Sequence, residues 1–285
     1  MKIHYLIILL LFSGTLMAQN SSRTSFQVNV SELSSANMEA GSSSAGLQIK
    51  GDKKASVLAV STEKSKEDEK LPATFAVQIL QNNAAGFYPL ILGSFGLNSK
   101  ISFTYYGVFW TNASFGTLES GGDLWFEYGA GIGFKAAGGK LFVNPSLGFT
   151  NGKFLSGGAQ NVIGDGIVPS VFALFNHGHF ETEFYLSYYK ALRSEGPVTR
   201  DFVLNWVLPG FKIGKHLALG MHYEQFVNTR VTNGDAASVY QWLGGYVRLT
   251  AGKGYSLRIS AGKNLYDGPI APEFYKISVF LPLLQ

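Results

Sequence analysis

The sequence predicts an all-β chain that closes into an antiparallel barrel of about twelve strands and crosses a membrane. Apolar residues recur at every second position from Pro72 onward, which is the period of a β-strand. Most of the predicted strands are long enough to cross a bilayer at a tilt, which requires about 9 to 11 residues. The connections between them alternate between short and long, as they do in the hairpins of transmembrane barrels.

The composition agrees with a lipid-facing surface. Charged residues make up 15% of the chain and aromatic residues 14%, whereas soluble domains carry about 25% charged residues. The net charge of +4 does not indicate a nucleic-acid partner, because the Lys and Arg residues form no cluster beyond one run of mixed sign. We expect no cofactor.

The first eighteen residues have the pattern of a secretory signal peptide. Lys2 precedes an apolar run over residues 5–12, and small residues lead up to Ala18. This run is shorter than the roughly 20 apolar residues of a transmembrane helix. We expect cleavage after Ala18. Because the chain contains no Cys, we expect neither a lipid anchor nor a disulfide.

The segment that follows is expected to be a flexible periplasmic tail. Residues 31–70 are rich in Ser, Gly, Lys and Glu and have few large apolar side chains to compensate the cost of ordering. Two short segments, 25–30 and 55–60, could instead form strands on the barrel or on a partner. The predicted domains are a signal peptide over 1–18, a tail over 19–71 and a barrel over 72–285.

The strands are predicted from the alternating pattern and its interruptions. They cover residues 73–82, 87–97, 101–110, 122–134, 140–150, 166–176, 179–190, 200–212, 216–228, 237–250, 254–264 and 273–283. Short turns, each with Gly or Asn, are expected at 98–100, 136–139, 177–178, 214–215 and 252–253. Longer loops are expected at 83–86, 111–121, 151–165, 191–199, 229–236 and 265–272. We expect the short turns and both termini in the periplasm and the long loops outside the cell.

Residues 72–285 resemble outer-membrane β-barrel proteins of Gram-negative bacteria, including porin-like families. The last strand, FYKISVFLPLLQ, is similar to the C-terminal segment that the barrel-insertion machinery reads, although it ends in Gln285 rather than in an aromatic residue. Its alternating apolar positions are Tyr275, Ile277, Val279, Leu281 and Leu283. The resemblance implies an outer-membrane location, with lipid and the insertion machinery as partners. It implies no particular solute, because fold does not determine substrate.

The alternation also divides the side chains into an inner and an outer set. The charged inner set is Glu127, Glu181, Glu183, His222, Glu224, Arg248, Arg258 and Lys276. The outer set is Phe126, Tyr128, Phe184, Leu204, Trp206, Leu219, Met221, Leu249, Leu257, Ile259 and Val279. An Arg or Lys on the lipid face costs about 2 to 4 kcal/mol near the midplane. The charged residues are therefore the candidate functional residues, inside the barrel.

These charges are compatible with two functions. The bases come from the last three strands and the acids largely from the middle of the chain, so that an acidic and a basic wall would face each other. We favour an open, porin-like pore for small polar or charged solutes. The alternative is a closed structural or adhesion barrel in which the charges pair and fill a narrow lumen. We expect Glu224 to pair with Arg248, which lies in the neighbouring strand.

Several aromatic residues fall on the inner register. They are Tyr106, Trp110, Trp125, Tyr185, Tyr189, Trp242 and Tyr246. Stacked rings could hold sugars or nucleosides, could fill the lumen, or could belong to the girdles at the membrane surfaces. Near the strand ends we favour the girdle.

The sequence indicates neither an enzyme nor a metal site. The histidines His177, His179 and His216 fall at turns, without ligand-spaced carboxylates. His222 and Glu224 lie two residues apart on one strand face, and this pair is the main support for an outer-membrane lipid hydrolase. Against that hypothesis, no GxSxG segment follows a strand and opens a helix. Glycines 129, 131 and 133 lie inside a strand, where we expect them to make room in the lumen.

Overall fold

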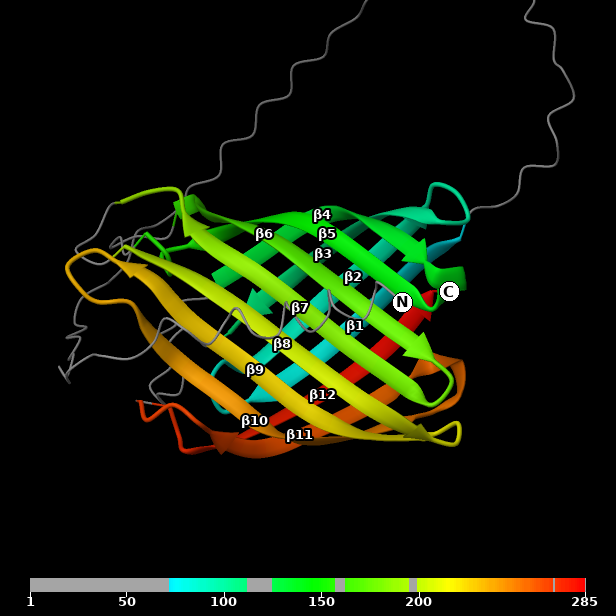
Figure 1. Cartoon of the computed structure of the whole chain (residues 1–285). Coiled ribbons are helices and arrows are strands. Elements are labelled where there is room, and N and C mark those ends of the chain that lie inside the picture. Colours follow the sequence, from blue (N-terminus) through cyan, green and yellow to red (C-terminus); the bar gives the residue numbers. More distant parts are fainter. Residues whose placement is uncertain (1–71, 112–124, 157–161, 195–198, 269, 285) are drawn as a thin grey trace, which may run out of the picture. The chain divides into compact units, whose positions relative to one another are not determined.

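The computed structural model describes residues 72–111, 125–156, 162–194, 199–268 and 270–284. They form a closed barrel of twelve antiparallel strands, in which each strand pairs with its sequence neighbours and β1 pairs with β12 (Figure 1). The predicted fold class and strand number are confirmed. No helix among these residues is long and apolar enough to cross a membrane. The predicted signal peptide and tail lie outside the described residues and remain predictions.

The strands follow the predicted pattern closely. Their bounds are β1 Ala73–Asn82, β2 Gly86–Gly96, β3 Ile101–Trp110, β4 Trp125–Ala136, β5 Leu141–Gly152, β6 Val162–His177, β7 Phe180–Ala191, β8 Arg200–Ile213, β9 Leu217–Val231, β10 Ala237–Thr250, β11 Ser256–Asn264 and β12 Glu273–Leu284. The largest difference is at β6, which begins four residues earlier than predicted. Gly152 pairs with Val162 beyond a bulge, and Asn151 accepts a hydrogen bond of 2.9 Å from the amide of Gly164. The predicted loop 151–165 is therefore partly strand.

The two ends of the barrel differ in their connections. At one end, the turn end, the strands are joined through 97–100, 137–140, 178–179, 214–216 and 251–255. Gly178 and Gly214 supply the left-handed backbone that such tight turns need, with φ of 58° and 69°. At the other end, the loop end, the connections are 83–85, 111–124, 153–161, 192–199, 232–236 and 265–272. The last strand, β12, runs towards the turn end (Figure 1). The predicted loop 111–121 lies almost wholly outside the described residues.

The outer face of the barrel is apolar. Neighbouring strands place their apolar side chains in register, as in the row formed by Leu249, Leu257, Val279 and Ile79. Met221, which faces outward on β9, is 57% exposed. Such a surface would be poorly soluble in water, and it matches the lipid-facing band of a transmembrane barrel.

The predicted outward orientation is wrong for two residues on β8. Leu204 is 7% exposed and packs inside the barrel, and Trp206 donates a hydrogen bond to the inner residue Glu183. The error arises because β8 carries apolar residues on both faces. Its mid-strand polar residue, Asn205, pairs with the exposed outward residue Leu186, so polarity indicated the wrong phase for this strand.

Candidate functional site: the barrel lumen

The acidic side chains of β7 reach across the lumen to the bases of β10 and β11. Arg248 pairs with Glu181. Arg258 Nη1 lies 2.7 Å from Glu183 Oε2, and its Nη2 lies 3.3 Å from Oε1 of the same carboxylate. Both pairs join residues that are more than sixty positions apart in the chain. They therefore link β7 to strands that are not its neighbours in the sheet, across β8 and β9 in one pair and across β8, β9 and β10 in the other.

A third ion pair is centred on Glu224 of β9. Lys276 Nζ of β12 donates to Glu224 Oε2 at 2.6 Å, His222 Nε2 lies 3.1 Å from the same oxygen, and the Tyr240 hydroxyl donates to Oε1 at 2.9 Å. The expected pairing of Glu224 with Arg248 is wrong. Arg248 is paired in the sheet with Ala218 of β9, and Ala218 lies six residues nearer to the turn end than Glu224. The Arg248 side chain is therefore too far along the barrel to reach Glu224, and it contacts Glu181 instead.

Aromatic side chains connect these ion pairs into one assembly. Trp206 Nε1 donates to Glu183 at 2.9 Å, and Lys276 Nζ lies 4.9 Å from the centre of the Trp206 ring, a cation–π distance. The Tyr246 hydroxyl donates to Glu181 at 3.0 Å, and the Arg258 guanidinium lies 5.9 Å from the Tyr246 ring centre. We call this assembly the cross-lumen network. Its members are Glu181, Glu183, Trp206, His222, Glu224, Tyr240, Tyr246, Arg248, Arg258 and Lys276.

Glu127 occupies a separate position on β4. Its carboxylate is 1% exposed and accepts hydrogen bonds from the Tyr106 hydroxyl at 2.9 Å, the Tyr189 hydroxyl at 3.2 Å and Trp110 Nε1 at 3.3 Å. These donors are all neutral. A carboxylate buried in this way depends on its hydrogen bonds to offset the loss of hydration.

Glycines make room for two of these tyrosines. A Cβ added at Gly129 or Gly148 would lie 2.5 or 2.2 Å from an atom of Tyr106, and one at Gly220 would lie 2.3 Å from Tyr246. Each ring therefore lies flat against the barrel wall, with its hydroxyl directed at a carboxylate. The predicted role of Gly129 in making room in the lumen is confirmed.

Near the loop end a continuous series of rings in contact, nearly all of them stacked, lines the inside of the barrel, and we call it the aromatic arc. Consecutive ring centres are 4.1 to 5.8 Å apart. The series runs through Tyr88, Trp110, Trp125, Phe154, Phe202, Phe226, Tyr240, Trp242 and Phe274. The expected girdle role is wrong for Trp125 and Trp242, which are 3% and 0% exposed inside the barrel. Trp125 stacks with Trp110 and Phe154, and Trp242 stacks with Tyr240 and Phe274, so the two tryptophans offer little surface to a sugar or a nucleoside.

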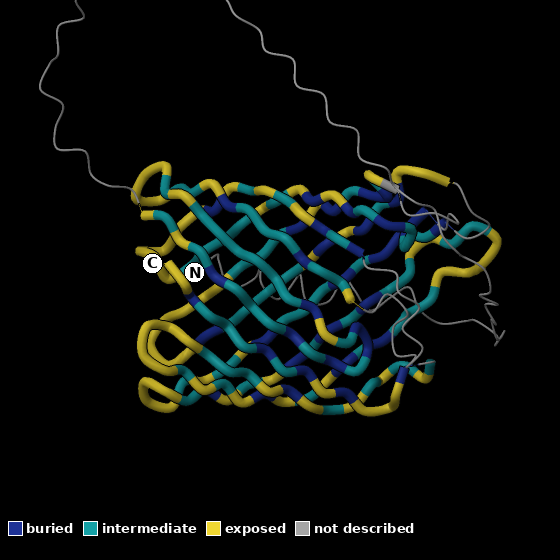
Figure 2. Tube along the Cα trace, turned by 180° about the vertical axis from the view of Figure 1, so that it is seen from behind, coloured by how far each residue is buried: buried dark blue, intermediate teal, exposed yellow. Residues whose placement is uncertain are grey.

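Water reaches the two halves of the lumen to different extents. The side chains of Arg248 and Glu183, toward the turn end, are 30% and 19% exposed, whereas those of Glu224 and His222, deeper in the barrel, are 2% and 1% exposed. Buried residues are concentrated toward the loop end in Figure 2. The described lumen therefore has a wet turn-side half and a dry loop-side half.

Trp206 was missed by the polarity pattern, although its position follows from the strand register. Counting back from the short turn at 214–216 pairs Ala218 with Lys212 and Glu224 with Trp206. Residues directly opposite in a pair of strands share a face of the sheet. The hairpin count therefore places Trp206 on the same face as Glu224.

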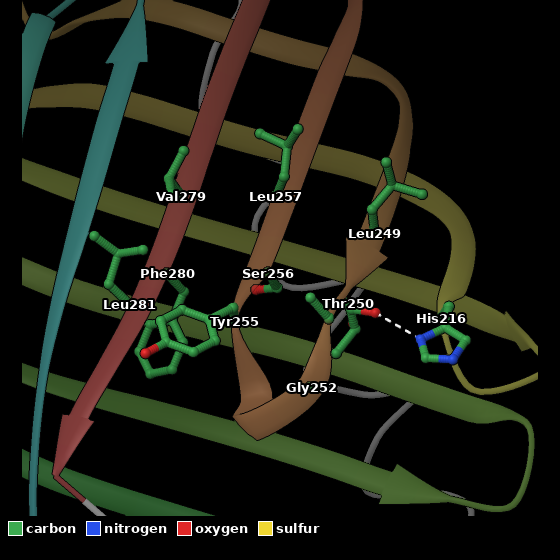
Figure 3. A pocket seen from close by; sticks show the side chains of 11 residues that line it. His216, Leu249, Thr250, Gly252, Tyr255, Ser256, Leu257, Val279, Phe280 and Leu281 are labelled. Carbon is green, nitrogen blue, oxygen red and sulfur yellow. Dashed lines mark hydrogen bonds between the residues drawn. The ribbon is translucent and has the colours of Figure 1, made fainter.

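A shallow concavity of about 590 Å³ lies on the outside of the barrel at the turn end. Leu249, Leu257 and Val279 project into it from three adjacent strands, and His216 Nδ1 lies 2.9 Å from the carbonyl oxygen of Thr250 at its edge (Figure 3). Its lining is the apolar band, so this concavity is part of the lipid-facing surface. Among the described residues, no group of three His, Asp or Glu side chains is placed to hold a metal ion.

The chain belongs to a family of proteins described as "Family of unknown function (DUF6733)", whose model matches residues 53–283. The match begins within the segment predicted as a tail. No curated protein matches the chain in sequence.

Solved structures with a similar fold are outer-membrane proteins. The COG4313 outer membrane channel from Pseudomonas putida F1 is 10% identical, with a TM-score of 0.50 over 78% of this chain and 100% of that one. The outer membrane channel DcaP of Acinetobacter baumannii is 16% identical, with a TM-score of 0.41 over 74% and 72% of the two chains. The KdgM porin in complex with disordered oligogalacturonate is 11% identical, with a TM-score of 0.41 over 73% and 98%. With its apolar outer band, the chain has the fold of an outer-membrane β-barrel.

The Glu224–Lys276 pair should contribute much more to stability than an exposed pair. Lys276→Met leaves a buried carboxylate without its cation, and we expect a loss of about 3 to 5 kcal/mol in the free energy of unfolding. The double variant Glu224→Gln/Lys276→Met should recover most of that loss. Denaturant unfolding of the barrel in lipid vesicles measures these differences.

The matched control is Lys263→Met. Lys263 and Glu273 form an ion pair of the same length, 2.6 Å, but their side chains are 68% and 71% exposed. We expect little change in this variant, because water screens an exposed pair. Equal destabilisation by Lys263→Met and Lys276→Met would contradict the structural role given to the cross-lumen network.

Proposed function

We propose that the protein is a porin-like channel in the outer membrane that passes small polar or charged solutes through a narrow lumen. The observation that carries the proposal is the set of acidic and basic side chains that line the lumen, of which Arg248 and Glu183 are partly exposed to water. Well-packed apolar side chains would fill a purely structural barrel at no greater cost than buried ion pairs. The similar structure from Pseudomonas putida F1, an outer membrane channel, supports the proposal.

The charges of the lumen would act on a solute through their paired signs. A solute that enters from the turn end meets the Glu181–Arg248 and Glu183–Arg258 pairs, in each of which an acid and a base lie side by side. Such an arrangement favours ions and dipolar molecules over apolar ones, because they can exchange water for protein charges. We expect weak conductance, since the aromatic arc and the cross-lumen network narrow the passage.

A closed structural or adhesion barrel is the second candidate, and the dry loop-side half favours it. Trp242, Glu127 and Glu224 are each at most 2% exposed, as in small barrels whose interiors are packed. We propose no catalytic role. The His222–Glu224 pair lies in the lumen, and Glu224 already accepts from Lys276 and Tyr240.

Recordings in planar bilayers distinguish the two candidates. We expect wild type to give small, stable conductance steps, well below those of open barrels with 16 to 18 strands. Arg248→Gln removes positive charge where water reaches the lumen and leaves Glu181, so the reversal potential in a salt gradient should shift toward cation preference. Lys215→Gln, at an exposed turn, is the control and should leave the preference nearly unchanged.

The double variant Glu181→Gln/Arg248→Gln completes the experiment. It removes the Glu181–Arg248 ion pair without leaving an unpaired charge, so the variant should conduct at least as well as wild type. If wild type and this variant are both silent while the barrel remains folded, the channel proposal is wrong and the closed barrel is supported.

We further propose that the loop end faces the outside of the cell and that both termini lie in the periplasm, after removal of residues 1–18 and with 19–71 as a periplasmic tail. Short turns on the periplasmic side and longer loops outside are the usual arrangement of bacterial outer-membrane barrels.

Epitope tags test the orientation. A tag inserted at Gly234, in the exposed connection between β9 and β10, should be labelled on intact cells, whereas one at Gly139, in the exposed turn between β4 and β5, should be labelled only after permeabilisation. The reverse pattern would invert the proposed topology.

A further inference from the structure

A compact charged cluster lies on the outer surface of the barrel near the loop end, apart from the lumen. Asp201 of β8 is 1% exposed and accepts from Lys190 Nζ of β7 at 2.8 Å. Arg230 of β9 contributes two contacts to the same carboxylate, Nε at 2.6 Å and Nη2 at 3.0 Å. The amide of Ala191 and the hydroxyl of Tyr188 also donate to it, at 2.9 and 3.2 Å.

The cluster faces away from the lumen. Tyr189 and Ser187 of β7 point inward and are 2% and 1% exposed, whereas Tyr188, between them, is 37% exposed. The side chains of Lys190 and Arg230 are 39% and 45% exposed. The buried carboxylate thus lies behind two outward cations, and the group carries one net positive charge. This arrangement fixes the cations and leaves part of each of them accessible.

The depth of the cluster matches that of lipid headgroups. Outward residues of β7, counted from the turn end, begin with Phe180 and reach Leu186, Tyr188 and then Lys190. Ten residues of a strand tilted by about 40° rise about 25 Å, the height of the lipid-facing band. Lys190 therefore lies at the upper limit of that band. Tyr188, just below it, has the amphipathic character of residues at a membrane surface.

We propose that Lys190 and Arg230 form a binding site for a phosphate group of the phosphorylated glycolipid in the outer leaflet. Guanidinium and ammonium groups form strong, charge-assisted hydrogen bonds with phosphate oxygens. A basic group at headgroup depth is the arrangement that recognises an anionic lipid. Asp201 acts as a positioning residue that holds the two cations side by side. The inference uses the proposed orientation only to assign the leaflet, and binding can be tested in detergent without it.

Native mass spectrometry of the full chain in detergent tests the site. The probes are bisphosphorylated lipid A, fully dephosphorylated lipid A and inorganic phosphate. We expect a specific adduct with the phosphorylated lipid, and roughly tenfold weaker binding in Lys190→Gln/Arg230→Gln, because two charge-assisted contacts are lost. Lys140→Gln/Lys215→Gln, which removes the same charge from the turn end, should bind like wild type.

Two further variants distinguish a loss of lipid binding from misfolding of the barrel. Lys190→Gln/Arg230→Gln/Asp201→Asn also removes the carboxylate that would be left unpaired, and it should show the same loss of lipid. Lys190→Arg/Arg230→Lys keeps both charges and should retain most of the binding. The proposal is overturned if the variants without the two cations bind the phosphorylated lipid as well as wild type does, if the dephosphorylated lipid binds equally, or if inorganic phosphate alone competes at similar concentrations.

Discussion

A charged group inside a membrane barrel must find water, an opposite charge or hydrogen-bond donors, and this constraint governs the lumen described above. The lipid offers none of these, so the charged residues of the long strands are directed inward or to the membrane surfaces. Inside, Glu181, Glu183 and Glu224 each meet a base from a distant strand. Pairing across the lumen therefore does more than neutralise charge, because it links walls that backbone hydrogen bonds connect only around the circumference.

The backbone obeys the same rule on a larger scale. Every peptide group within the lipid needs a hydrogen-bond partner, which a strand satisfies only if both its edges are paired. The pairing of β1 with β12 removes the last free edges. Closure in turn fixes the interior volume, and large side chains must share it. Gly129, Gly148 and Gly220 leave room for Tyr106 and Tyr246 to lie flat and to donate to carboxylates.

Much of the fold could be predicted because an alternating strand is a strong signal. The bounds of β1, β3 and β10 agree with prediction at both ends. The face of β8 could not be predicted from polarity, since both of its faces are apolar in the middle and Asn205 faces outward. The partner of Glu224 depends on the register of its strand with the strands around it. Knowing that β9 and β10 are neighbours does not show which of their residues lie at the same height. The aromatic arc was unpredictable for a similar reason, because an inward ring near a strand end resembles a girdle ring until the packing around it is known.

The account rests on a lumen that is wet at the turn end and dry toward the loops, and cysteine accessibility tests this most directly. The chain has no Cys, so single variants report without background. The two test positions are Ser102, on the turn side of β3, and Ser187, which is 1% exposed on β7. Cysteine differs little from serine in size, so Ser102→Cys and Ser187→Cys should disturb the barrel little. With a thiol reagent larger than water and simple ions, we expect the folded Ser102→Cys barrel to react readily and the folded Ser187→Cys barrel to stay unreacted until it is unfolded. Similar rates at the two positions in the folded protein would contradict the account, because they would require a wide water-filled passage through the aromatic arc.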